Sequence, residues 1–179
     1  IMKNKSVLFG VFIFSIFSFY IKKTRERWIK HRNAIVSLES LLNEHLDELS
    51  GNEHLLNGSI ETYSKSGYSY NYYRELQLKP NIDLDIGHLD LLNKYFYYKT
   101  TINRINHDLL MQNKAQELLH QAALSNNLTQ DNLKINREHL MQNASQIKKY
   151  ITKAAIPEAT DLLAYVRILL SKEKERPMQ

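Results

Sequence analysis

Residues Val7–Ile21 read VLFGVFIFSIFSFYI, an uncharged stretch that contains five phenylalanines. As a helix this stretch covers about 22 Å, against about 30 Å for the hydrocarbon core of a bilayer. Ser6 lengthens it at one end, and Tyr20 and the lysines that follow are suited to the membrane interface. Because apolar residues surround the helix on all sides, we expect residues 6–21 to span a membrane rather than lie on its surface.

A cleaved signal peptide is the alternative interpretation, since Lys3 and Lys5 supply a basic segment ahead of the apolar run. A cleavage site needs small residues after that run, and Lys22 and Lys23 stand there instead. We therefore expect an uncleaved membrane helix, with residues 1–5 as a short tail before it.

Basic residues follow the expected span more densely than they precede it. The segment 22–32 contains Lys22, Lys23, Arg25, Arg27, Lys30 and Arg32. The positive-inside rule then predicts a single-pass protein of the cell membrane whose C-terminal part lies in the cytoplasm. Cations at this position also meet the anionic head groups of membrane lipids, so we interpret 22–32 as a basic juxtamembrane helix.

The net charge of +5 is concentrated at the N-terminal end. Residues 1–32 contain eight Lys or Arg and one acidic residue, Glu26, whereas the rest of the chain contains 16 basic and 18 acidic residues. Nucleic-acid binding needs a basic face on the folded part of a protein. The nearly neutral charge of that part argues against nucleic acid as a partner.

Behind the span, apolar residues recur at steps of three and four, the spacing of a buried helix face. This pattern predicts an all-α fold, an elongated antiparallel helical bundle over residues 33–171, followed by a charged tail at 172–179. The longest helix is expected at 86–124. Its expected apolar face consists of Leu89, Leu92, Phe96, Ile102, Ile105, Leu109, Leu118, Leu119 and Ala122.

Residues that favour helix ends mark the expected boundaries. The sequence SGN at 50–52 predicts a stop, followed by a short helix over 53–62. Thr129 or Asp131 is expected to cap the third long helix. Pro157 either kinks the last helix or begins a fresh one.

The junction between span and bundle carries a family resemblance. Asn33-Ala-Ile-Val-Ser-Leu38-Glu39 with Asn43-Glu44, followed by Leu55-Leu56 and Ile60-Glu61-Thr62, resembles the start of the LemA family. The resemblance implies one N-terminal membrane helix before a helical bundle. It implies an architecture rather than a reaction.

Residues 63–80 crowd five tyrosines among Ser and Gly and are expected to form an ordered, extended connection. One interpretation is that the rings pack over one end of the bundle. The other is an exposed binding loop, because tyrosine offers a large amphipathic contact area at low entropic cost. On that second interpretation, the candidate contacts for a protein partner are Tyr68, Tyr70 and Tyr72.

Patterns for catalysis and metal binding are incomplete. Glu117-Leu-Leu-His120 matches the Glu-x-x-His step of di-iron bundles, which need a second such step and two further carboxylates. Asp85-Ile-Gly-His88 is the nearest second step. The chain has no cysteine, no G-x-S-x-G motif and no glycine-rich phosphate loop. We therefore expect no enzymatic activity, no metal and no cofactor.

Polar residues also accompany the apolar face of the long helix. Asn103 and Asn106, beside Arg104, are expected to fix the register of the bundle, as buried asparagine does in coiled coils.

The function that these features favour is a non-enzymatic, membrane-anchored scaffold or interaction module. Its expected partners are membrane lipids and a protein, which includes a second copy of the chain as a homo-oligomer. A ligand-sensing bundle is the alternative, and an enzyme with an unrecognised site ranks third.

Overall fold

The structure is a computed structural model that describes the chain outside residues 1–2, 66, 68–69, 79–88, 126–128 and 175–179. Among the helical residues, it leaves the side chains of 3–13, 16 and 173–174 undescribed. The fold is all-α, as predicted, and the described residues form no strand. In chain order the elements are α1 (Lys3–Ser64), α2 (Leu89–Leu124), α3 (Gln130–Tyr150), a π-helix (Ile151–Ala155) and α4 (Ile156–Lys174).

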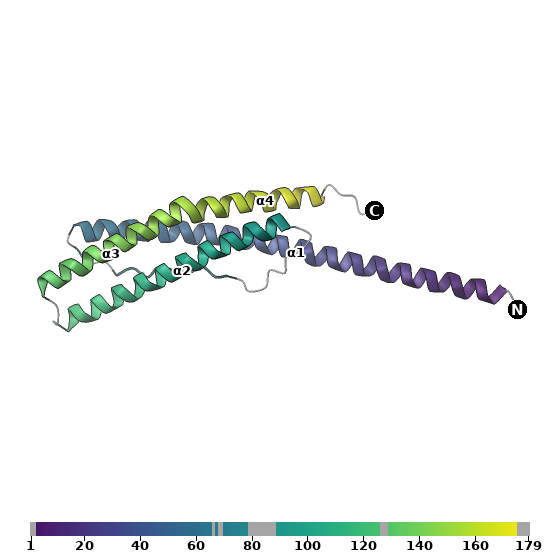
Figure 1. The fold of residues 1–179 in the computed structure, drawn as a ribbon, viewed down its shortest axis with the longest axis horizontal. Coiled ribbons are helices and arrows are strands. Elements are labelled where there is room, and N and C mark those ends of the chain that lie inside the picture. Colours follow the sequence, from purple (N-terminus) through teal and green to yellow (C-terminus); the bar gives the residue numbers. More distant parts are fainter. Residues whose placement is uncertain (1–2, 66, 68–69, 79–88, 126–128, 175–179) are drawn as a thin grey trace.

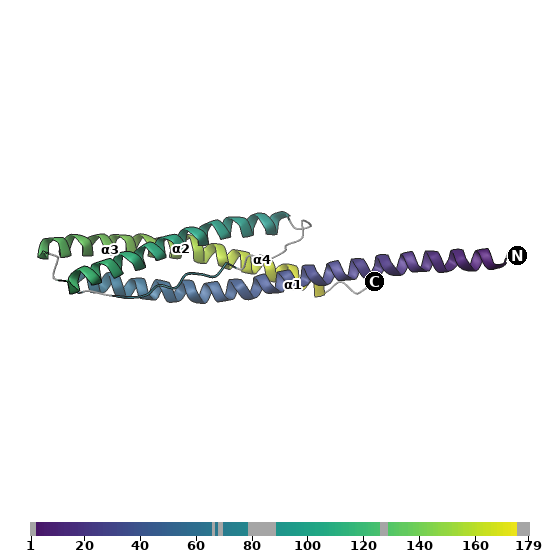
Figure 2. The same ribbon diagram turned by 90° about the horizontal axis from the view of Figure 1, so that it is seen from below.

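The helices form an elongated bundle from which the first part of α1 projects alone (Figures 1 and 2). The projecting part carries residues 3–5 of the predicted tail, the predicted span and the basic segment on one continuous helix, and residues 1–2 of the tail lie outside the described residues. The core begins at Ile35, whereas residues 17–30 are exposed. We call residues 3–33 of α1 the arm.

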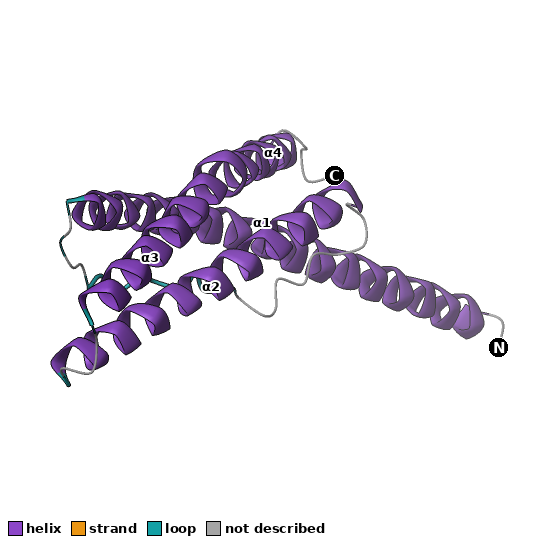
Figure 3. Ribbon diagram, turned by 60° about the vertical axis from the view of Figure 1, so that its left-hand side comes forward, coloured by secondary structure: helices purple, strands orange, loops and turns teal. Residues whose placement is uncertain are grey.

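The predicted antiparallel arrangement is correct for α4 against α1 and wrong for α2 against α1. Arg167 near the end of α4 bonds Glu39 near the start of the bundle part of α1, at 3.1 Å. In contrast, α1 and α2 run in the same direction (Figures 1 and 3). An antiparallel α2 would require a tight turn directly after α1. Instead, residues 70–78 return along the bundle, and α2 begins at the end where the arm enters.

The helix stop predicted at 50–52 is wrong, because α1 continues without a break to Ser64. Gly51 lies inside the helix, and a Cβ built on it would meet nothing within 4 Å. Asn52 is buried, and its side-chain amide bonds the backbone of Arg74. Asparagine ends helices when its side chain competes for its own backbone. Here the side chain is engaged by a distant segment, so the helix continues.

We expect Gly51→Ala to raise the free energy of unfolding by about 0.5–1 kcal/mol, because alanine loses less backbone entropy in a helix. Gly67→Ala is the matched control, since its Cβ would lie 2.9 Å from Thr62 Cγ2 and 3.0 Å from the Thr62 carbonyl oxygen. Thermal unfolding followed by circular dichroism compares the two. A lower melting temperature for Gly51→Ala would contradict a helix at this position.

The apolar face predicted for α2 is correct in the middle of the helix and wrong in its first turns and at Leu118, which is 66% exposed. Ile102, Ile105 and Leu109 are buried, whereas Leu89 and Phe96 are exposed. The inward positions of the first turns are instead held by Leu91, Tyr95 and Tyr98. Tyrosine is tolerated there because a buried hydroxyl can find a hydrogen-bond partner.

The sequence singled out the residue that begins α3 and the proline near the start of α4. Thr129 is its N-cap and accepts a hydrogen bond from the Asn132 N–H at 3.3 Å. The helix neither ends nor begins afresh at Pro157, because α3, the π-helix and α4 follow one another without a gap. The Ile156 N–H reaches back five residues to the Ile151 carbonyl. This wider turn makes room for a proline, which lacks an N–H and crowds the carbonyl four residues before it.

Candidate functional site

Residues 70–78, which we call the strap, lie between α1 and α2 along much of the bundle (Figures 1 and 2). The Asn71 N–H donates to Gln116 Oε1 at 2.9 Å, and the Leu76 N–H donates to Asn106 Oδ1 at 2.8 Å. These two contacts are about 15 Å apart along α2. Five fully extended residues cover about 17 Å. The strap is therefore extended and runs antiparallel to α2. The extended connection predicted over 63–80 is thus confirmed for residues 70–78, whereas Tyr63 and Ser64 belong to α1.

Two asparagines of α2 bind the strap backbone in the same way. Asn113 accepts from the Tyr73 N–H at 3.0 Å and donates to the Tyr73 carbonyl at 2.9 Å. Asn106 accepts from the Leu76 N–H at 2.8 Å and donates to the Leu76 carbonyl at 2.8 Å. Each side-chain amide thus satisfies both polar backbone groups of one strap residue, as a neighbouring β-strand would.

A third asparagine makes the same contact from the opposite side. Asn52 of α1 accepts from the Arg74 N–H at 3.0 Å and donates to the Arg74 carbonyl at 2.7 Å. The strap is therefore bonded along both edges, by amide side chains that belong to two different helices. Asn106, predicted to fix the register of the bundle, fixes the position of the strap instead.

Two strap side chains fill the space between the helices. Tyr73 and Leu76 are both fully buried in the main core. The Tyr73 hydroxyl lies 2.6 Å from Ser59 Oγ, which also accepts from Asn71 Nδ2 at 2.8 Å. Burial raises the pKa of Tyr73, so its hydroxyl stays protonated and available as a donor.

The end of the strap is bonded by a buried histidine. His45 Nε2 lies 3.0 Å from the Gln77 carbonyl oxygen, and His45 Nδ1 lies 2.7 Å from the Tyr98 hydroxyl. A carbonyl can only accept, so Nε2 donates to it. In the neutral ring Nδ1 then accepts from Tyr98. Burial, followed by the negative charge of Glu158, raises the pKa of Tyr98 and keeps that donor protonated.

The predicted contact tyrosines lie at the start of the strap or just before it. Tyr70 is 53% exposed and Tyr72 is 68% exposed, while Tyr68 lies outside the described residues. The Tyr70 ring packs beside His120 of α2, with 5.4 Å between ring centroids. The tyrosine-rich connection thus contains rings of both kinds: Tyr73 packs in the core, and Tyr72 faces solvent. That these exposed rings contact a partner stays a prediction.

The arm presents apolar and basic side chains outside the bundle. Phe14, Phe17 and Phe19 are exposed. All six predicted basic flank residues are exposed as well, and the Arg32 guanidinium lies 5.5 Å from the centre of the Trp28 ring. The side chains of residues 6–13 and 16 within the predicted span lie outside the described ones. Among the residues described, no helix is long and apolar enough to cross a membrane.

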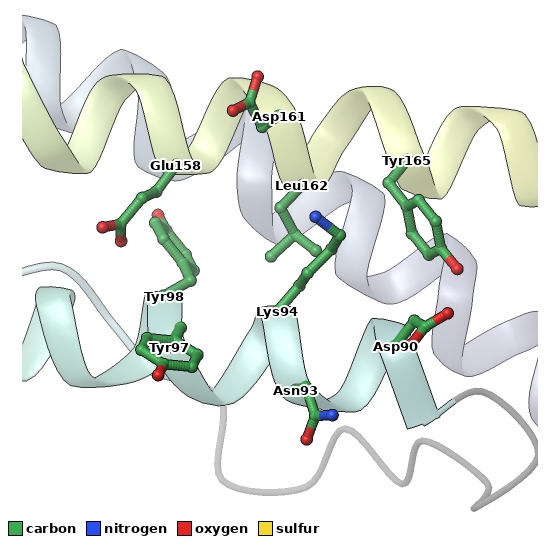
Figure 4. A pocket seen from close by; sticks show the side chains of 9 residues that line it. All are labelled: Asp90, Asn93, Lys94, Tyr97, Tyr98, Glu158, Asp161, Leu162 and Tyr165. Atoms are coloured by element: carbon green, nitrogen blue, oxygen red, sulfur yellow. The ribbon is translucent and has the colours of Figure 1, made fainter.

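An open groove of about 520 Å³ lies between α2 and α4 (Figure 4). Glu158 and Tyr165 reach into it from α4, and the Lys94 ammonium lies 5.8 Å from the centre of the Tyr165 ring. The residues that line this groove are Asp90, Asn93, Lys94, Tyr97, Tyr98, Glu158, Asp161, Leu162 and Tyr165. These residues place charges of both signs beside aromatic rings, and they include no serine, cysteine or histidine that could act as a nucleophile or base.

The partial di-iron pattern is not assembled by the described residues. Glu117 and His120 are both exposed on α2, and Asp85 and His88 lie outside the described residues. No group of three His, Asp or Glu side chains in the described part of the chain could hold a metal ion.

The asparagine contacts to the strap are the feature that sequence reasoning missed. A signal was present, since Asn106 and Asn113 are seven residues apart and so share one face of a helix. An amide row beside an apolar row indicates a helix that binds polar backbone as well as side chains.

No protein-family model, curated protein or solved structure matches the chain. The resemblance of residues 33–62 to the LemA family therefore stays a prediction.

Proposed function

We propose that this protein is a non-enzymatic interaction module that the arm of α1 holds at a membrane. The observation that carries the proposal is the arm itself, an exposed helix outside the bundle with Phe14, Phe17 and Phe19 on its surface. Exposed large apolar side chains on a helix outside the bundle favour burial in another apolar medium. The sequence 7–21 supplies such residues around the whole helix.

The exposed cations of 22–32 support the orientation of this arrangement. Lysine and arginine beside a span favour the cytoplasmic side and attract anionic lipid head groups by about 1 kcal/mol each. The bundle, which carries a nearly neutral charge, would then lie in the cytoplasm of a single-pass cell-membrane protein.

The anchor is tested by alkaline carbonate washing of membranes. We expect the full chain to stay in the pellet and the Phe14→Lys/Phe17→Lys variant to be released, because each lysine in the middle of a span costs about 2.5–3.5 kcal/mol. The matched control is Phe96→Lys/Tyr97→Lys, which places the same charges on exposed positions of the bundle. A reporter fused after Gln179 should be active in the cytoplasm. Release of the unmodified chain would overturn the proposal.

The partner surface that we propose on the bundle is the exposed edge of the tyrosine-rich connection. Tyrosine residues are common among the positions that dominate interface energies, and removal of one such ring costs about 2 kcal/mol or more. Tyr70 and Tyr72 leave much of their rings exposed, on a segment whose backbone is bonded in place. This combination provides a rigid apolar contact at a low entropic cost.

We expect replacement of Tyr68, Tyr70 and Tyr72 by serine to leave the bundle folded and to remove most cross-linked product with neighbouring proteins in native membranes. Circular dichroism monitors the fold, and Tyr97→Ser is the matched control because Tyr97 is exposed on α2, where it lines the groove between α2 and α4. Unchanged cross-linking would remove these tyrosines from the partner surface.

A further inference from the structure

The strap occupies a groove that is built to bind an extended backbone. We propose that this groove, between α1 and α2, binds an extended peptide of another protein when the strap leaves it. The peptide carries a tyrosine followed three residues later by a leucine, the spacing of Tyr73 and Leu76. The inference deepens the proposed interaction role by naming the class of partner, and it does not depend on the membrane anchor.

The asparagines of the groove bind the backbone of the strap and none of its side chains. Asn52, Asn106 and Asn113 each bond both the N–H and the carbonyl of one strap residue. Any peptide offers these same groups, as in strand addition to a sheet edge. The amides belong to the helices, so they remain when the strap departs. Buried amides without partners are costly, and exchange of one peptide for another is therefore favoured over an empty groove.

The side chains of the strap define the specificity. Tyr73 and Leu76 point into the core, and Ser59 bonds the tyrosine hydroxyl. A phenylalanine has no hydroxyl to place beside Ser59 Oγ, so the first position favours tyrosine. The strap residues between and beside these two anchors face solvent; they are Tyr72, Arg74, Glu75 and Gln77. The groove should therefore tolerate most side chains at those positions, except proline at the position of Arg74, whose N–H bonds Asn52.

The length of the connection permits the exchange. His45 lies level with Tyr98, so Leu89 lies level with the region just after the arm, and the connection from Ser64 must cover about 42 Å along the bundle. Residues 65–88 reach about 80 Å when extended. The helices can thus stay packed while the strap is out of the groove.

The test uses a fluorescent peptide with the sequence of residues 70–78, YNYYRELQL, and the full chain in a mild detergent. Leu76→Ala weakens the strap as the internal competitor and leaves every groove residue in place. We expect the peptide to bind this variant at least about tenfold more tightly than the unmodified chain, in anisotropy titrations, with one peptide per chain. A peptide with alanine at both anchor positions should not bind. Equal affinity for the two chains would overturn the proposal.

A second substitution in the Leu76→Ala chain tests whether the groove asparagines bind the peptide. Asn106→Ala should reduce peptide affinity, whereas Asn103→Ala, on an exposed position of the same helix, should leave it unchanged. If Leu76→Ala unfolds the bundle, saturating peptide should restore its helical signal and raise its melting temperature. Failure to bind or to restore the fold would make the strap a fixed part of the core. A dimer of the variant that forms without peptide would assign the groove to a second copy instead.

Amide hydrogen exchange tests whether the strap leaves the groove in the unmodified chain. The Tyr73 and Leu76 amides should exchange through a local opening, faster than the Ile105 amide in the middle of α2. Equal protection of the three amides would mean that the strap leaves only when the whole bundle unfolds, and would contradict the proposal. These measurements need no membrane, so their failure and the failure of the anchor test are distinguishable.

Discussion

Leu109→Asp is expected to lower the free energy of unfolding by about 4 kcal/mol, because it places an unpaired charge in an apolar interface. Leu109 is 0% exposed and lies in the middle of α2. Urea unfolding of the full chain in detergent, followed by circular dichroism, measures the loss.

The matched control for this substitution lies on the same helix. Leu118 is 66% exposed, so Leu118→Asp should change stability by no more than about 0.5 kcal/mol. Similar losses for the two variants would contradict the placement of the α2 face. Little change for Leu109→Asp would place that residue outside the core.

The second large effect is expected at the strap. Tyr73→Ala should cost about 3–5 kcal/mol, because it removes a fully buried aromatic ring from between α1 and α2. Tyr73→Phe keeps the ring and removes the hydroxyl with its hydrogen bonds to Ser59 and Gln116, so it should cost about 1–2 kcal/mol. Thermal and urea unfolding compare the variants.

Tyr72→Ala is the control for Tyr73→Ala, since the neighbouring ring is 68% exposed. It should leave the stability within about 0.5 kcal/mol of the unmodified chain. Equal losses at the two positions would mean that the strap lies on the bundle without a defined side facing the core.

Much of the helical fold could be predicted from apolar spacing alone. Ile102, Ile105 and Leu109 stand at helical steps in an otherwise polar context, and all three are buried. The first turns of α2 defeated the same reasoning because apolar and amphipathic side chains stand on both faces there. Hydrophobicity favours Leu89 and Phe96 as the buried residues, whereas Tyr95 and Tyr98 are buried in the structure.

The direction of α2 and the role of the strap could not be predicted by spacing within a helix. Both depend on bonds between residues far apart in the sequence, such as Asn52 with Arg74 and Asn113 with Tyr73. Asn52 next to Gly51 has the local pattern of a helix end. Its long-range bond to the strap outweighs that local preference, and the helix continues.

Because α1 is one unbroken helix, the arm and the α1 side of the groove belong to the same rigid element. Between residues 11 and 50 the sequence contains neither glycine nor proline, so no residue there introduces a hinge. If the arm rotates about its own axis, His45 and Asn52 therefore rotate by the same angle. One residue inserted at the junction would turn the arm by about 100° relative to the groove. The direction in which the groove faces, relative to the arm, is thus fixed by the number of helical residues between them.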